Sequence, residues 1–329
     1  MMELIVQPLG RSVPVAAGDN LLAALRENNI PISYSCTAGR CGTCRCRVLE
    51  GHVTESGQEA KITNPNEGRY VLACMCTLNE SCVIEVPEPD EIVTHPARIV
   101  KAEVISIDDA THDIKRIVLR CSKPLAFSPG QYAMLQFTPA HIRPYSMACL
   151  DTDDHLEFHV RLVPDGRVTG YIRDQLKVGD SVRVSGPMGT AYLRRKHTGP
   201  MLLIAGGTGL APVLSILRGA LATGMDNPMH VYFGVRSPAD IYCAEQLTAM
   251  AASHPHIRVQ IIVAMGDRAG EHRRGLVTDA VAEDLPNLDG WRAYLCGAPP
   301  MVDAATLLLR RRGIEPEHVY ADAFYASAT

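Results

Sequence analysis

The sequence is poor in aromatic residues and has no long apolar run. Phe, Trp and Tyr make up 5% of its 329 residues, so aliphatic side chains must fill the hydrophobic cores. A membrane-spanning helix needs about 18 consecutive apolar residues. The longest candidates, Met201–Ala205 and Val302–Leu309, are too short or interrupted by charge, so we expect no membrane segment. The N-terminus MMELIVQPLGR has no basic start followed by an apolar stretch, which argues against a secretory signal and favours the cytoplasm.

The sequence also lacks the basic stripe that nucleic acids require. The net charge is −4, and the first 90 residues hold seven Arg and Lys against eleven Asp and Glu. We therefore expect no nucleic-acid partner. Arg40, Arg45 and Arg47 interrupt this acidic background beside a group of cysteines. They form either a solvated edge or a docking rim for an acidic partner.

Three regions differ in their pattern, as the chain length allows. Residues 1–90 predict an α+β domain, with a hairpin and a short helix that Asp19 or Asn20 can cap. Residues 91–97 continue a proline-containing, extended linker. Residues 98–197 place β-branched runs between turn signals, which predicts an antiparallel β-barrel. Residues 198–329 alternate strands and helices, which predicts an α/β, doubly wound parallel sheet.

Four cysteines of the first region have the spacing of a metal site. Cys36, Cys41 and Cys44 follow C-x4-C-x2-C and Cys74 comes later, which is the plant-type [2Fe–2S] pattern. Zinc sites usually pair two short knuckles instead. There is no Cys-x-His pair, which excludes a Rieske centre, and no motif for a mononuclear iron. We therefore expect the chain to deliver electrons without activating oxygen itself.

The residues around these cysteines fit a compact cluster loop. Gly39 and Gly42 let the backbone curl closely and direct N–H groups at the sulfur atoms. Such donors stabilise the negative charge of a reduced cluster. Cys46 and Cys76 each lie two residues from an expected ligand, and we expect both to be packed thiols.

The second region carries residue types that a flavin requires. A flavin needs a cation for its pyrophosphate, an aromatic plane beside its ring and a hydroxyl near N5. Arg143, Tyr145 and Ser146 of the segment RPYS offer these three groups, although a plain strand would explain the tetrapeptide alone. Gly166–Thr169 predicts a turn that opens a short helix, whose amides can hold phosphate. Ser185–Gly189 predicts a tight turn where backbone can approach a cofactor.

The third region has the strand, glycine turn and helix of a dinucleotide site. Gly206–Pro212 reads G-x-G-x-x-P rather than G-x-G-x-x-G, and no acidic residue follows in Gly234–Ser237. Both departures disfavour a standard Rossmann dehydrogenase. Arg236 can hold a phosphate, lie over an adenine or remain at the surface. Cys296 ends a strand where a nicotinamide could meet the flavin, or is a buried thiol.

Taken in this order, the motifs resemble the ferredoxin–NADP reductase superfamily fused to a plant-type ferredoxin. This arrangement is familiar in the reductase components of naphthalene 1,2-dioxygenase and related aromatic-ring oxygenases. The segments that carry the resemblance include SYSCTAGRCGTCRCRV, RPYSMA, GGTGLAPVLSI, YFGVRS and YLCGAP. It implies a multidomain chain with a β-grasp-like ferredoxin domain, a FAD-binding barrel and a NAD(P)-binding parallel-sheet domain.

The resemblance and the motifs together define the expected site residues. Ser146 and Cys296 are the expected catalytic residues, and Phe324 is expected to cover the flavin. The residues expected to bind FAD or the dinucleotide are Arg143, Pro144, Tyr145, Ser146, Val160, Arg161, Arg167, Val168, Thr169, Gly207, Thr208, Gly209, Arg236, Ser237, Cys296, Gly297, Met301 and Phe324.

The resulting hypothesis is an NAD(P)H:ferredoxin oxidoreductase of an aromatic-ring-hydroxylating dioxygenase system. Electrons pass from NADH to FAD, to the [2Fe–2S] cluster and then to a Rieske-type ferredoxin that feeds a terminal oxygenase. NADH is the expected donor, with NADPH as a second donor that His272, Arg273 and Arg274 would tolerate. One alternative is direct delivery to an oxygenase or hydroxylase, such as salicylate hydroxylase. An alternative of another class is a non-catalytic redox sensor.

Overall fold

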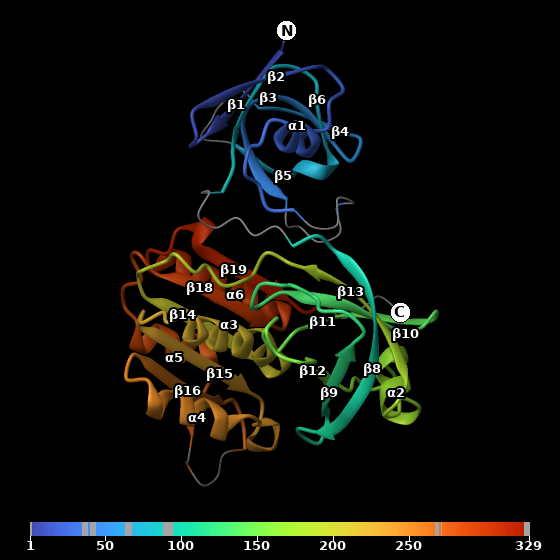
Figure 1. Cartoon of the computed structure of the whole chain (residues 1–329). Coiled ribbons are helices and arrows are strands. Elements are labelled where there is room, and N and C mark those ends of the chain that lie inside the picture. Colours follow the sequence, from blue (N-terminus) through green and yellow to red (C-terminus); the bar gives the residue numbers. More distant parts are fainter. Residues whose placement is uncertain are drawn as a thin grey trace. The chain divides into compact units, whose positions relative to one another are not determined.

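A computed structural model describes residues 2–34, 39, 44–62, 68–87, 95–266, 270 and 272–325, apart from the side chain of Ala60 (Figure 1). The chain divides into two compact units. One contains Met1–Ala97 and Gly186–Gly189, and the other contains Arg98–Ser185 and Thr190–Thr329. Across the described ranges, no helix is long and apolar enough to cross a lipid bilayer.

The N-terminal unit is a mixed sheet that packs against one helix. The sheet order is β2-β1-β7-β3-β4, with β5 and β6 also paired to β3, and β1 runs parallel to β7. The helix α1 (Leu21–Glu27) is capped by Asn20, whose Oδ1 accepts a hydrogen bond from Ala23 N at 3.1 Å. The strands are β1 (Met2–Gln7), β2 (Arg11–Val15), β3 (Arg45–Glu55), β4 (Gln58–Ile62), β5 (Arg69–Leu72), β6 (Cys76–Leu78) and β7 (Cys82–Glu85), with a 3₁₀ turn η2 (Ala73–Met75).

Residues from Arg98 onward begin with a six-stranded antiparallel sheet. Its order is β11-β10-β13-β8-β9-β12, and an antiparallel bridge from Met147 to Phe158 brings its two ends together into a nearly closed barrel. Alternating burial along β10 places one face of that strand in the barrel core. The elements are β8 (Arg98–Asp109), β9 (Ile114–Cys121), β10 (Tyr132–Thr138), β11 (His141–Ser146), β12 (Leu156–Arg161), α2 (Arg167–Asp174) and β13 (Ser181–Met188).

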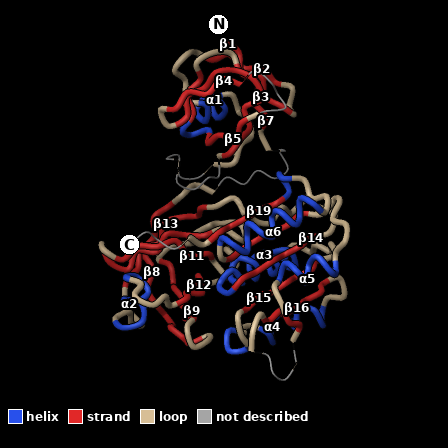
Figure 2. The backbone as a smooth tube through the Cα atoms, turned by 180° about the vertical axis from the view of Figure 1, so that it is seen from behind, coloured by secondary structure: helices blue, strands red, loops and turns tan. Residues whose placement is uncertain are grey.

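A six-stranded parallel sheet follows, in the order β17-β16-β15-β14-β18-β19. Helices α3 and α4 pack on one face, and α5 and α6 pack on the other, as the views from opposite sides show (Figures 1 and 2). The chain order reverses between β14 and β18, so the crevice beyond their carboxyl ends is the expected ligand site. The elements are β14 (Met201–Gly206), η4 (Gly207–Gly209), α3 (Leu210–Ala222), β15 (Met229–Val235), η5 (Pro238–Asp240), α4 (Ala244–Ser253), β16 (Ile257–Val263), β17 (Arg273–Arg274), α5 (Val277–Asp284), β18 (Arg292–Gly297), α6 (Pro299–Arg311), η6 (Pro316–His318) and β19 (Val319–Ala323).

Buried polar contacts fix the barrel against the parallel sheet within the second unit. Ser215 of α3 is fully buried, and its hydroxyl donates to the carbonyl of Cys149 at 2.7 Å and accepts from the Gly130 amide at 3.3 Å. Arg218 of the same helix pairs with Asp153 at 2.8 Å. These bonds satisfy the buried hydroxyl of Ser215 and hold the barrel and α3 in one arrangement.

The fold class expected from the sequence is confirmed, and the differences concern single elements. Helix α4 begins only at Ala244, because Cys243 has a left-handed backbone (φ +54°) and Pro238–Asp240 forms a separate turn. The short strands β4 and β5 were not expected. Their sequences alternate too briefly to stand out, and pairing with β3 stabilises them.

Candidate cofactor sites

Two of the four expected cluster ligands lie side by side in the N-terminal unit. Cys44 is buried at the start of β3, and Cys74 lies in the η2 turn after β5. The Cys74 amide donates to Cys44 Sγ at 3.4 Å, and the Gly39 amide donates to Cys74 Sγ at 3.3 Å. Such N–H to sulfur bonds suit a thiolate-bound cluster. The other two expected ligands, Cys36 and Cys41, lie outside the described residues.

The packing around this pair explains how the ligand turn is held. Asn20 uses its amide nitrogen to donate to the carbonyls of Cys74 and Cys76 at 2.9 and 3.3 Å while its oxygen caps α1. Cys46 and Cys76 are buried in the core, and burial raises the pKa of both thiols, that of Cys76 to about 12. Both are packed neutral thiols, as the sequence predicted.

The flavin motif lies on β11, at the rim of the barrel. Burial alternates along this strand, so half-buried Arg143 and Tyr145 share one face and Pro144 points the other way. The Tyr145 ring meets Phe137 edge-on, with centroids 6.5 Å apart, and burial raises the pKa of its hydroxyl. The strand thus presents one cation and one neutral phenol on the same face.

The expected phosphate turn precedes α2. Val168 is 3% exposed and its side chain packs in the barrel core. The Thr169 hydroxyl bonds both the amide and the carbonyl of Val163 at 3.2 Å, which folds the loop back on the helix. A Cβ on Gly166 would lie 2.3 Å from that hydroxyl, so the turn requires glycine. The groups available to bind a phosphate here are the backbone amides in the first turn of α2 and the exposed side chain of Arg167.

Ser146 and Cys296 meet a carboxyl group that sequence reasoning did not identify. The Ser146 hydroxyl donates to Asp322 Oδ2 at 3.2 Å, and Asp322 on β19 lies opposite Cys296 on β18 in the sheet register. Burial raises the pKa of Asp322 to about 6, although the bond from Ser146 counteracts part of this shift. Burial and the nearby Asp322 raise the pKa of the fully buried Cys296 thiol, which therefore stays protonated.

The glycine turn after β14 is packed tightly against the end of β18. A Cβ on Gly209 would lie 2.0 Å from the carbonyl oxygen of Cys296, which leaves no space for any side chain. Met301 of α6 fills the gap beside Gly206 and Gly297, where an added Cβ would meet its side chain within 3.0 Å. Gly207 adopts a left-handed backbone (φ +54°) at the start of the turn. The glycines thus let the backbone of the turn pack closely at the switch point of the sheet.

Arg161, at the end of β12, lies directly beside this turn. Its Nη1 would be 3.2 Å from a Cβ on Gly207, so the guanidinium covers the glycine. Two carboxylates hold it: Asp113 lies 3.1 Å from its Nε, and Asp240 lies 3.2 Å from its Nη2. His112, Asp113 and Asp240 could by their spacing surround a metal ion, but both carboxylates already pair with the Arg161 cation.

The neighbouring residues of β12 are tied to the parallel sheet as well. Val160 is fully buried in the barrel core. His159 bonds the Tyr242 hydroxyl at 3.1 Å and Glu157 at 3.0 Å. Burial alone would raise the pKa of Glu157, but hydrogen bonds from His159 and Arg116 outweigh it and lower that pKa to about 2.

The remaining expected residues differ in whether their side chains already bind other groups of the chain. Ser237 caps the η5 turn, with its hydroxyl donating to Asp240 at 2.8 Å, while Arg236 before it is exposed. Arg273 is bound by Glu283 and Asp284, so its charge is already neutralised. Phe324 is half-buried and its amide donates to the carbonyl of Gly297 at 2.8 Å. Residues 326–329 lie outside the described part of the chain.

Comparison with known proteins supports this three-part organisation. The family models that match are the 2Fe-2S iron-sulfur cluster binding domain over residues 4–79, the oxidoreductase FAD-binding domain over 101–192 and the oxidoreductase NAD-binding domain over 203–306. A Ralstonia protein named as the reductase component of naphthalene 1,2-dioxygenase/salicylate 5-hydroxylase systems is 59% identical over 99% of both chains. A Pseudomonas putida protein named as the reductase component of a naphthalene 1,2-dioxygenase system is 58% identical over 98% of this chain and 99% of its own.

The chain belongs to the family of iron–sulfur flavoprotein reductases that serve oxygenase systems. Members of known structure have the same fold. An Amycolatopsis cytochrome P450 reductase superimposes with a TM-score of 0.72 at 35% identity, covering 98% of this chain and 99% of its own. The ferredoxin reductase in carbazole 1,9a-dioxygenase gives 0.66 at 27% identity, covering 98% of each chain. The chain is thus an oxidoreductase that uses a [2Fe–2S] cluster, FAD and NAD(P).

Within this reductase, three acidic residues contact the expected site residues Ser146 and Arg161 but were not identified from the sequence. Asp322 carried a usable signal, because it ends the strand beside that of Cys296 in a parallel sheet. Asp240 carried a local signal, the S-x-x-D capping pattern with Ser237. Asp113 lies in the hairpin turn before β9 and reaches Arg161 through the pairing of β9 with β12, so no local pattern marks it.

Proposed function

We propose that this reductase passes electrons from NADH to a Rieske-type ferredoxin, which feeds a terminal aromatic-ring dioxygenase. Two relatives of 58–59% identity are named as components of naphthalene dioxygenase systems, which favours an aromatic-ring oxygenase as the final acceptor. The observation that carries the step from NADH to FAD is the contact between Ser146 and Asp322, with Cys296 opposite, because it joins the flavin motif to the end of the nicotinamide sheet. We assign the protein to the cytoplasm.

The proposed division of labour follows the domains expected from the sequence, 1–90 for the cluster, 91–97 as linker, 98–197 for FAD and 198–329 for NAD(P). Cys36, Cys41, Cys44 and Cys74 hold the cluster. FAD held at this site would supply the conversion of a two-electron hydride into single electrons for the one-electron cluster. The first turn of α2, Arg143 and Tyr145 bind the flavin, and Phe324 covers it.

Ser146 orients the reacting groups in this proposal, and Asp322 holds the Ser146 hydroxyl in place. When Asp322 is ionised it accepts a hydrogen bond from the Ser146 hydroxyl, so the hydroxyl hydrogen has one fixed direction. The protonated Cys296 thiol offers a neutral, close-fitting surface to the nicotinamide, since a thiolate would compete as a nucleophile. No general acid–base pair is required for hydride transfer.

Arg161 is best assigned to the phosphates of the dinucleotide rather than to those of FAD. Its guanidinium covers Gly207 of the glycine turn and is oriented by Asp113 and Asp240. A planar, oriented guanidinium suits a pyrophosphate bound over that turn. Exposed Arg236 and Ser237 follow the next strand, where the adenosine half of a dinucleotide would lie.

The test is reconstitution with purified components and naphthalene as substrate. We expect NADH-dependent ring oxidation to need this reductase, a Rieske-type ferredoxin and the terminal oxygenase together. Ring oxidation without the ferredoxin would favour the alternative of direct delivery, for which the Ralstonia relative named for a salicylate 5-hydroxylase system supplies the reason. Failure to turn over repeatedly with cytochrome c would favour the redox-sensor alternative.

A further inference from the structure

Arg45 and Tyr70 form an exposed basic and aromatic patch on the N-terminal unit. The Arg45 guanidinium carbon lies 4.0 Å from the centroid of the Tyr70 ring, and that of Arg47 lies 6.0 Å from it. Strands β3 and β5 pair antiparallel, with Arg47 opposite Tyr70. Tyr70 is 42% exposed, so its ring faces solvent beneath a stacked cation instead of filling the core.

The patch adjoins the expected iron–sulfur site along the backbone. Arg45 directly follows Cys44, and β5 ends at Leu72, just before the turn that carries Cys74. The Ala73 amide donates to the Cys44 carbonyl at 2.9 Å, which keeps the two ligand-bearing segments together at this end of the strand pair. A molecule seated on the patch would therefore lie close to the cluster.

The charge of the patch is only partly balanced. Arg47 pairs with Glu85 at 3.8 Å and Arg69 with Glu55 at 3.3 Å. Arg45 has no carboxylate within ion-pair distance in the part of the chain that is described, and its contact is the Tyr70 ring. A guanidinium stacked on a ring keeps its edge N–H groups for a carboxylate. Arg and Tyr are also the residue types that dominate binding energy at interfaces.

We propose that Arg45 and Tyr70 form the docking site for an acidic iron–sulfur protein that takes one electron from this chain's cluster. The electron leaves the reduced cluster and reduces one iron of the acceptor, with no proton transferred. The first 90 residues carry a net charge of −4, so an acidic acceptor is repelled from most of this unit and steered to the patch of Arg45 and Tyr70. The inference rests on the proposed function, since it names the surface that the electron acceptor uses.

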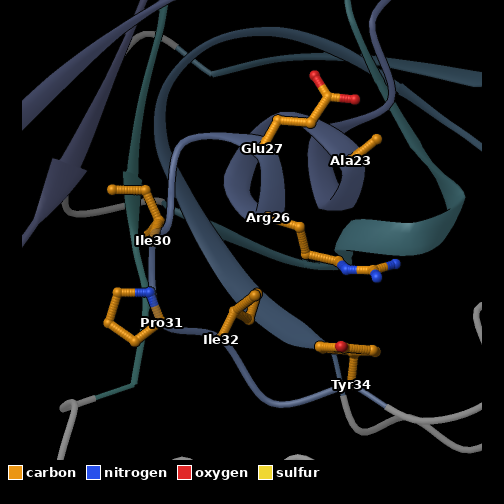
Figure 3. A pocket seen from close by; sticks show the side chains of 7 residues that line it. All are labelled: Ala23, Arg26, Glu27, Ile30, Pro31, Ile32 and Tyr34. Atoms are coloured by element: carbon orange, nitrogen blue, oxygen red, sulfur yellow. The ribbon is translucent and has the colours of Figure 1, made fainter. Parts of the chain in front are cut away.

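The test compares Arg45→Glu and Tyr70→Ala with a matched control in the full-length, cofactor-loaded protein. The control is Arg26→Glu, because the Arg26 guanidinium also stacks on a tyrosine, 4.5 Å from the Tyr34 ring centroid (Figure 3). The probe is a Rieske-type ferredoxin of net negative charge from a naphthalene dioxygenase system. At low ionic strength we expect Arg45→Glu to raise both the KM and the Kd for this ferredoxin about tenfold, and Tyr70→Ala several-fold. Arg26→Glu should change both less than about twofold.

Two further measurements separate this inference from the proposed function. Stopped-flow reduction of flavin and cluster by NADH should be unchanged in Arg45→Glu, and reduction of basic cytochrome c should not slow. An unchanged ferredoxin Kd in Arg45→Glu, or an equal loss in Arg26→Glu, would refute the docking site while leaving the proposed function intact. Slower flavin-to-cluster transfer in Arg45→Glu would refute it by assigning the patch to transfer within the chain. A wild-type cluster that NADH reduces but that cannot reduce the ferredoxin would overturn the proposed function and the docking site together.

Discussion

The Ser146 hydroxyl on β11 donates a hydrogen bond of 3.2 Å to Asp322 on β19, across the junction of the barrel and the parallel sheet. Asp322 in turn lies opposite Cys296 at the end of β18. The expected flavin hydroxyl and the expected nicotinamide thiol therefore share one neighbour. Because burial raises the pKa of that neighbour to about 6, its charge changes close to neutral pH.

Replacing Asp322 by Asn should remove a pH dependence from flavin reduction. In the wild type, we expect the stopped-flow rate constant for flavin reduction by NADH to fall several-fold from about pH 7.5 to about pH 5, because protonation removes the carboxylate that orients Ser146. Asp322→Asn should be about tenfold slower and flat over this range. An inflection near pH 6 that persists in Asp322→Asn would assign the titration to another group.

The same carboxyl should also affect the pH dependence of stability. Its folded-state pKa of about 6 lies above the ordinary value of 3.8, so protons bind more tightly to the folded protein. Its contribution to stability is present below about pH 4 and is lost as the pH rises to about 6. Over this window, chemical denaturation should show the free energy of unfolding of wild type falling relative to that of Asp322→Asn. A difference that is constant with pH would contradict the raised pKa.

Arg161→Ala should weaken binding of the dinucleotide more than binding of FAD. Its guanidinium covers Gly207, so we expect the KM for NADH to rise about 10–100-fold, as for loss of a charge-assisted hydrogen bond. Asp240→Asn keeps the shape of the Ser237 cap but weakens the interaction with the Arg161 guanidinium. It should therefore raise the KM for NADH about threefold to tenfold. Loss of FAD from purified Arg161→Ala with an unchanged KM would instead assign Arg161 to the flavin.

Much of the site could be predicted because its residues are close in sequence. The cysteine spacing, the RPYS strand and the glycine turn are local patterns. The structure places Cys44 directly before β3, the RPYS segment at the end of β11 and the glycine turn directly after β14. Arg161, Asp113 and Asp240 come from three separate segments, and only the pairing of β12 with β9 and the packing of the barrel on the sheet bring them together. Local patterns also did not reveal that the Val168 side chain belongs to the core.

Alanine at Gly209 should destabilise the protein, whereas alanine at Gly170 should stabilise it. A Cβ at Gly209 would lie 2.0 Å from the Cys296 carbonyl oxygen, so the ends of β14 and β18 must separate, at a cost of about 2–4 kcal/mol. Gly170 lies inside α2 with nothing within 4 Å of its added Cβ, so alanine should add about 1 kcal/mol through helix propensity. Urea denaturation of the full-length variants measures both changes in the free energy of unfolding, in the transition of the second unit. Equal stabilities of Gly209→Ala and wild type would contradict the packing described at the turn.

Asn20→Ala should loosen the cluster turn as well as α1. It removes the cap on Ala23 and the bonds to the carbonyls of Cys74 and Cys76, so we expect a loss of about 1–2 kcal/mol and faster loss of cluster absorbance on dilution. Asn20→Asp keeps a capping oxygen but lacks the amide donor. It should therefore retain the stability of α1 while still losing the cluster faster. Equal cluster lifetimes in Asn20→Asp and wild type would show that the amide bonds do not support the ligand turn.

The most direct test of the proposed electron route is an anaerobic NADH titration of the purified protein, followed by visible absorption and low-temperature EPR. We expect the flavin to bleach and a rhombic [2Fe–2S] signal to develop as electrons reach the cluster. Cys74→Ser should abolish the signal while flavin bleaching by NADH persists, which would place Cys74 among the ligands. Bleaching of the flavin with no cluster signal, in wild-type protein of intact iron and sulfide content, would contradict transfer from NADH through flavin to the cluster.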